Sequence, residues 1–137
     1  MYENLTKLIP ELQKEEYGEW IIDMDSKGTV EDPIHMPYVN YSKTVKELVR
    51  VIYDFVNEHK DYNLTGYQEI LKKNGIDWES ESIRKTDVST ADGQLVMALL
   101  VAVLRADRFV EGTLLDFYKN GLVLLWLQRL KEIDEVK

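Results

Sequence analysis

The amino-acid sequence predicts a mainly α-helical fold, in which a single domain of five or six helices spanning residues 1–137 surrounds a buried apolar helix. Apolar residues recur at helical spacing in several segments, and typical capping or terminating residues bound these segments. One further segment is apolar on every side, which is the pattern of a helix buried on every side. The length and the 45% hydrophobic content are those of one ordinary globular domain.

The first third of the chain predicts one helix and then an extended segment. Four apolar residues share one face of the first helix: Leu5, Leu8, Ile9 and Leu12. Because Pro10 lacks an amide hydrogen, we expect this helix to kink or restart there. The helical period then disappears, and Gly and Pro punctuate the chain. We therefore expect a short extended or hairpin segment near residues 19–41, turning at residues 25–28.

Two helices are predicted in the middle of the chain. Thr44 and Glu47 have the spacing of a capping box, and an apolar stripe follows them to about Glu58. Thr65 and Gln68 form a second possible capping box, which opens a short helix ending at residues 72–75.

The central helix is predicted from its uniform apolar character. Residues 77–89 are polar and predict a loop or a single irregular turn. A helix capped by Ser89 or Thr90 then runs through Ala106, and its middle, Leu95–Leu104, is apolar on all sides. We expect this helix to form the centre of the core.

Two more helices complete the prediction. Asp107 caps the first of them, which ends at Asn120 and Gly121, and the last helix begins at Leu122. Residues 122–127 are six apolar residues in succession, more than one buried stripe requires. Some of them would face outward unless another chain covers them, so this helix predicts a homodimer.

Composition excludes several classes of function. The formal charge is −8, and residues 11–32 alone hold eight acids against two lysines. Such a chain repels phosphate backbones and anionic lipid, so we expect neither nucleic acid nor membrane as a partner. The absence of cysteine excludes disulfides and thiolate chemistry. The ten-residue apolar run is too short to span a bilayer, and no signal peptide is visible, so we expect a cytoplasmic protein.

Neither of two possible metal sites fits its pattern. Residues 23–28 begin like a calcium loop, but Lys27 and Ile34 occupy positions where oxygen ligands are needed. The two histidines, His35 and His59, lack a ligand at the i+4 spacing. We therefore expect no metal and no cofactor.

The densest polar cluster contains Arg105, Asp107, Arg108 and Glu111 beside an apolar helix. Two arginines at a helix junction could hold a carboxylate or phosphate in a bidentate fork. They could equally pair with the two acids and fasten the corner between helices, while Gly112 permits close packing. We favour the structural role, because ion-pair networks order residues without any ligand.

Three segments, the last in two parts, resemble an uncharacterised bacterial family, domain of unknown function 6508. They are GEW at 18–20 with MPYVNYS at 36–42, ILKKNGIDW at 70–78, RADRFVEGTLLDF at 105–117 and WLQRLKEID at 126–134. The resemblance covers nearly the whole chain, and RADRFVEG is its most specific part. It implies a small, mainly helical protein and carries no established activity or catalytic residue.

Two functional hypotheses follow. The first is a non-catalytic intracellular helical module that acts through an unidentified protein partner or through self-association. The alternative is a small-molecule or anion-binding protein, extending to an enzyme, that uses the Arg105 and Arg108 corner; catalysis is the less expected outcome. A concave pocket with unpaired arginines would favour the alternative, and a flat apolar patch would favour the first hypothesis.

Overall fold

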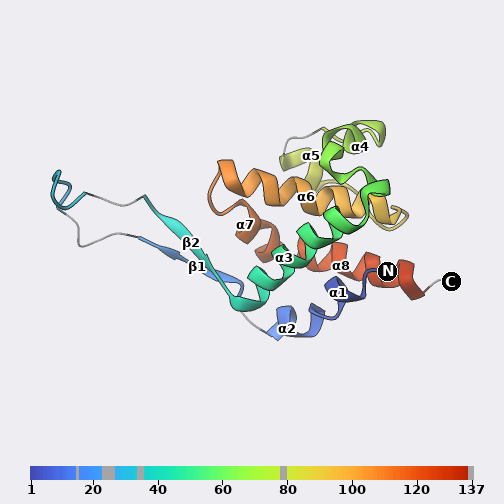
Figure 1. Ribbon diagram of the computed structural model, residues 1–137, viewed down its shortest axis with the longest axis horizontal. Coiled ribbons are helices and arrows are strands. Elements are labelled where there is room, and N and C mark those ends of the chain that lie inside the picture. Colours follow the sequence, from blue (N-terminus) through green and yellow to red (C-terminus); the bar gives the residue numbers. More distant parts are fainter. Residues whose placement is uncertain (15, 23–26, 34–35, 78–79, 136–137) are drawn as a thin grey trace.

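The computed structural model describes the chain except residues 15, 23–26, 34–35, 78–79 and 136–137. A helical body carries a long two-stranded arm that projects from one end (Figure 1). The mainly α prediction is confirmed. The buried apolar residues of the body form one continuous cluster, so the fold is a single domain.

The body contains more, and shorter, helices than expected. Its elements are α1 (Glu3–Thr6), α2 (Ile9–Lys14), α3 (Lys43–Glu58), the 3₁₀ turns η1 (Lys60–Tyr62) and η2 (Leu64–Gly66), α4 (Tyr67–Lys73), α5 (Ser80–Arg84), α6 (Gly93–Phe109), α7 (Thr113–Lys119) and α8 (Leu122–Glu135). The first predicted helix is divided into α1 and α2. Pro10 lies in the first turn of α2, where a missing amide hydrogen costs nothing.

The central helix is α6, as predicted. Every residue from Leu95 to Leu104 is at most 7% exposed. Helices α3, α4, α7 and α8 pack around it. Its N-cap is Asp92, whose carboxylate accepts a hydrogen bond from the Leu95 amide, so the predicted cap at Ser89 or Thr90 is wrong. Ser89, Thr90 and Asp92 can each cap a helix, and the sequence pattern alone does not show which of them does so.

Two other predicted helix starts are also corrected. Ser42, rather than Thr44, caps α3, and its hydroxyl accepts a hydrogen bond from the Val45 amide. Helix α4 follows η2 directly and starts at Gly66 without a side-chain cap, so the predicted capping box at Thr65 and Gln68 is absent. The chain here is already wound into a 3₁₀ turn, which satisfies early backbone groups without a capping side chain.

The apolar run in α8 is largely covered by the chain itself. Four residues of α8 are fully buried: Val123, Trp126, Leu127 and Leu130. Leu122 and Leu124 are half-buried, while Leu125 is 47% exposed. Helices α1, α2, α6 and α7 supply the contacts. This run therefore no longer requires a second chain, so the homodimer stays a prediction that the run itself does not support. Within the described part of the chain, no helix combines the length and apolar character needed to cross a bilayer.

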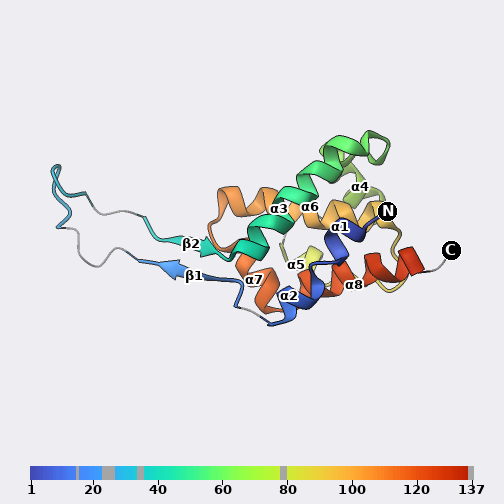
Figure 2. The same cartoon turned by 60° about the horizontal axis from the view of Figure 1, so that its bottom comes forward.

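The predicted extended segment is an antiparallel hairpin. Strands β1 (Gly18–Ile21) and β2 (Tyr38–Tyr41) pair in a register that runs from Gly18 opposite Tyr41 to Ile21 opposite Tyr38. We call residues 18–41 the arm. Figure 2 shows that it extends well beyond the helical body. The expected turn at 25–28 includes residues that are not described; a turn is seen at residues 28–32, where the Gly28 amide donates to the Asp32 carbonyl oxygen.

Candidate functional site

The foot of the arm is fixed to the corner between α6 and α7 by hydrogen bonds. The Tyr41 hydroxyl donates to Asp107 Oδ1 at 2.9 Å, and the same carboxylate oxygen accepts from the Leu114 amide at 3.0 Å. The Tyr41 hydroxyl oxygen in turn accepts from the Leu115 amide at 3.2 Å. Asp107 lies within α6, yet its carboxylate binds an amide in the first turn of α7. The predicted cap at Asp107 is therefore wrong, because the N-cap residue of α7 is Gly112, although the Asp107 carboxylate does bind an amide in the first turn of α7.

The second acid of the polar cluster also binds the arm. Glu111 Oε1 accepts a hydrogen bond from the Val39 amide of β2 at 2.9 Å. Burial raises the pKa of the Tyr41 hydroxyl far above its ordinary value, and the negative charge of Asp107 raises it further. The acids at the corner are therefore engaged with a backbone amide and with a neutral tyrosine.

Strand β1 is held by close packing on a glycine. Gly112 has φ +90, and a Cβ atom there would lie 2.3 Å from Cζ2 of Trp20. The indole ring therefore lies directly against the backbone of Gly112, where only glycine fits. Both strands of the arm are thus anchored at the α6–α7 corner.

The two arginines do not make the ion pairs considered from the sequence. Among the described residues, neither Arg105 nor Arg108 forms an ion pair with an acid. Arg105 Nε is buried and has no hydrogen-bond partner in that part of the chain. Arg108 is exposed, and its guanidinium carbon lies 5.9 Å from the centroid of the Tyr53 ring. Among the described residues, the acids of the corner bind the arm and α7, and neither pairs with Arg105 or Arg108.

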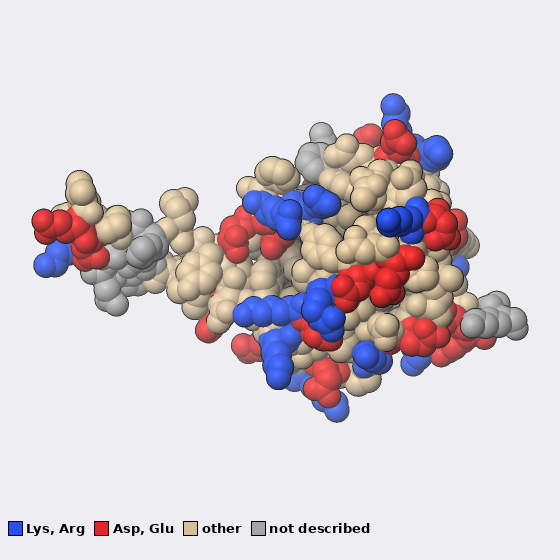
Figure 3. All heavy atoms as spheres, viewed as in Figure 1, with Lys and Arg blue, Asp and Glu red and all other residues tan. Residues whose placement is uncertain are grey.

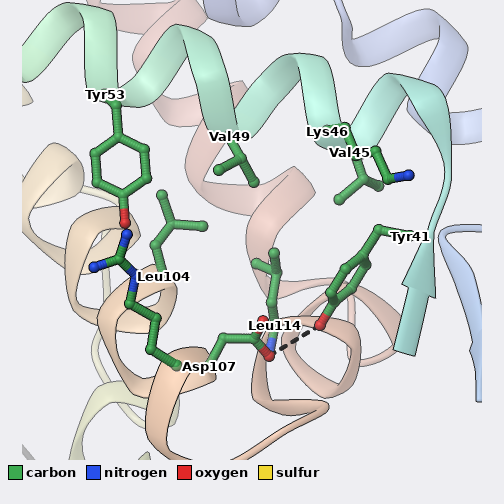
Figure 4. Close-up of a pocket in the computed structure, with 9 residues that line it drawn as sticks. Tyr41, Val45, Lys46, Val49, Tyr53, Leu104, Asp107 and Leu114 are labelled. Carbon is green, nitrogen blue, oxygen red and sulfur yellow. Dashed lines mark hydrogen bonds between the residues drawn. The ribbon is translucent and has the colours of Figure 1, made fainter. Parts of the chain in front are cut away.

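A pocket of about 290 Å³ lies beside this corner, between α3 and the α6–α7 junction. Figure 4 shows Tyr53 and Val49 of α3 on one side and Leu104 and Leu114 on the other. The remaining lining residues are Tyr41, Val45, Lys46, Asp107 and Arg108. Arg105 is not among them, so the two arginines do not converge on one ligand position.

Exposed apolar side chains concentrate on the arm and on the end of α6 next to the foot of the arm. Among the described residues, seven of the nine large exposed hydrophobic residues lie there: Trp20, Ile22, Val30, Met36 and Tyr38 on the arm, and Phe109 and Val110 at the end of α6. Val30, near the tip, is completely exposed. Sequence patterning predicted the hairpin but not its projection from the body. Whether a hairpin projects depends on whether its strands pack against helices, and the local pattern of residues does not determine that packing.

The described histidine has a packing role. His59 stacks on Phe55 with ring centroids 4.1 Å apart. His35 and the start of the rejected calcium loop lie outside the described residues. No group of three or more potential metal ligands occurs in the described part of the chain.

The fold and site define a small helical domain with an anchored, exposed hairpin arm. The model of a family of unknown function, DUF6508, matches residues 2–136, so the chain belongs to this family. No curated protein and no solved structure gives a significant match.

Proposed function

We propose that this chain is a protein-binding module whose contact surface is the arm together with the adjacent end of α6, at Phe109 and Val110. The observation that supports this function best is the concentration of exposed apolar side chains at one end of the molecule. Exposed large apolar side chains that gather in one region of a protein are typical of interaction sites. The partner is a second copy of the chain or a different protein.

The architecture of the arm supports the same conclusion. Two paired strands are marginally stable alone, and the hydrogen bonds and close packing that join the described residues of this hairpin to the helices lie at its foot. Each strand of this two-stranded sheet has an outer edge where a partner can add backbone hydrogen bonds, although on β2 the Val39 amide is already bound to Glu111. A partner that covered the arm would stabilise it and bury its apolar side chains.

Charge adds a further property of the partner. Residues 22–37 contain four acids against Lys27, a net charge of −3. An apolar surface with a basic rim would complement this segment, and like charge would disfavour acidic proteins.

The test replaces three exposed apolar residues of the arm by serine, in the variant Ile22→Ser/Val30→Ser/Met36→Ser. These side chains are 58%, 100% and 83% exposed, so the helical body should keep its stability. The matched control is Leu125→Ser, which removes an exposed apolar side chain from α8. Sedimentation velocity measures self-association, and co-purification from the native cell followed by mass spectrometry measures other partners.

We expect wild type and control to associate, with a second copy or with a specific protein, and the triple variant to lose that association. Unchanged association of the triple variant would contradict the proposal. A wild-type chain that stays monomeric and co-purifies with no specific protein would also contradict it.

A further inference from the structure

The pocket beside the foot of the arm is a separate feature from the exposed apolar surface. Its floor is apolar, because Val45, Leu104 and Leu114 are each at most 5% exposed. Its volume of about 290 Å³ corresponds to roughly ten water molecules at the density of the liquid. Pockets near this size, mostly apolar with a few polar groups at fixed positions, are typical small-molecule sites.

The rim of the pocket is basic. Lys46 and Arg108 line it, and both side chains are exposed. In Figure 3, Lys and Arg side chains lie on both sides of a hollow near the foot of the arm, and Asp and Glu side chains lie beside the upper group. The pocket's own acid, Asp107, already accepts hydrogen bonds from Tyr41 and from the backbone of α7.

Arg108 is the rim residue best placed to bind an anion. The acids nearest to it in the sequence are Asp107 and Glu111, and both are committed to hydrogen bonds with the arm or with α7. Within the described chain its guanidinium makes no ion pair, and it lies over the face of Tyr53. A guanidinium over a ring keeps its planar fork of donors available for a carboxylate.

We propose that this pocket binds a small carboxylate with an apolar or aromatic body. Arg108 receives the carboxylate at the rim, and the body enters the space between Val49 and Leu104, beside the Tyr53 ring. Lys46 adds positive potential at the opening. The apolar floor gives no hydrogen-bonding partner to a ligand that is polar throughout, so it disfavours inorganic anions and sugars.

The probe for this proposal is 3-phenylpropionate, which joins one carboxylate to one aromatic ring. Three compounds serve as controls. The amide 3-phenylpropionamide keeps the shape and lacks the charge, while acetate and phosphate keep the charge and lack the apolar body. Binding is measured by titration of the ¹⁵N-labelled full chain, following amide chemical shifts in NMR spectra at constant ionic strength.

We expect 3-phenylpropionate to bind in the millimolar range, with the largest shifts at the amides of Val49, Leu104 and Leu114. The amide, acetate and phosphate should each bind at least tenfold more weakly. Shifts that are absent from these amides, or equal affinity for the probe and its neutral amide, would overturn the proposal.

Two variants and one control assign the binding to the pocket. Arg108→Gln should weaken binding of 3-phenylpropionate about tenfold, the loss of roughly one charged hydrogen bond. Val49→Phe should abolish binding by filling the pocket while leaving Arg108 in place. Arg50→Gln removes an equal charge from an exposed arginine of α3 that pairs with Glu47 and Asp54, and should not change the affinity. Equal weakening by Arg108→Gln and Arg50→Gln would show a general charge effect and contradict the assigned role of Arg108.

Discussion

The hydroxyl of Tyr41 and the carboxylate of Asp107 are joined by a 2.9 Å hydrogen bond that links the last residue of β2 to the end of the central helix. The two residues are 66 positions apart in the sequence. Both side chains also bind amides in the first turn of α7. One pair of side chains thus connects the arm, α6 and α7.

Removal of the Tyr41 hydroxyl should destabilise the protein. Tyr41→Phe leaves the Leu115 amide without its acceptor in a half-buried position and removes one donor from Asp107. We expect the free energy of unfolding to fall by about 1–3 kcal/mol, measured by urea denaturation. The control is Tyr38→Phe, whose side chain is 50% exposed and should change stability by less than about 0.5 kcal/mol. Equal effects of the two substitutions would show that the network contributes nothing.

Stability should fall in alkaline solution because of two tyrosines. Burial raises the pKa of Tyr41, and burial together with the hydrogen bond to Tyr62 raises the pKa of Tyr2. Below the unfolded-state pKa of about 10, both states are protonated and the stabilisation is fully present. Above it, the unfolded state releases protons that the folded state retains, so the free energy of unfolding decreases as pH rises.

Urea denaturation on either side of that pKa measures this effect. The decline should be shallower in Tyr41→Phe and in Tyr2→Phe than in wild type. A wild-type free energy of unfolding that stays constant up to two pH units above the unfolded-state tyrosine pKa would refute the raised pKa of Tyr41 and Tyr2.

The start of the central helix depends on Asp92. Asp92→Ala removes the acceptor for the Leu95 amide and should lower stability by about 1 kcal/mol. Thr90→Ala, at one of the two cap positions that the sequence predicted, should have little effect. Thermal or urea unfolding of the two variants decides between them, and a larger loss in Thr90→Ala would reverse our assignment of the cap.

Glu111 should control the opening of the arm at its foot. In Glu111→Ala the Val39 amide loses its acceptor, so hydrogen exchange of that amide should accelerate by at least tenfold. Glu111→Gln keeps an oxygen acceptor, so the Val39 amide should exchange much more slowly in this variant than in the alanine variant. If both variants exchange at the wild-type rate, another group protects the amide.

Sequence patterning predicted the features that depend on local periodicity. The uniformly apolar stretch from Leu95 to Leu104 indicated a helix buried on all sides, and α6 has that position. The weaker predictions were helix starts, because Ser42, Thr44, Asp92 and their neighbours have similar capping chemistry. Only backbone geometry separates such candidates.

The polar corner was found from sequence, but its contacts were not. Charges close together suggested that Arg108 would pair with Asp107 or Glu111. The acids instead bind Tyr41 and the Val39 amide, which come from a strand about 70 residues earlier in the chain. Long-range pairing of this kind leaves no local pattern. The same holds for Tyr53, which helps to form the pocket from α3.

Site-specific photo-crosslinking tests the proposed binding surface most directly. A photoreactive phenylalanine analogue replaces Val30 at the exposed tip of the arm in one variant and Leu125 on α8 in another, and both are irradiated in cells that produce the chain naturally. The proposed function predicts a discrete crosslinked protein, a second copy or another partner, from position 30 and none from position 125. A chain that crosslinks to no protein from position 30, or equally from both positions, would contradict it.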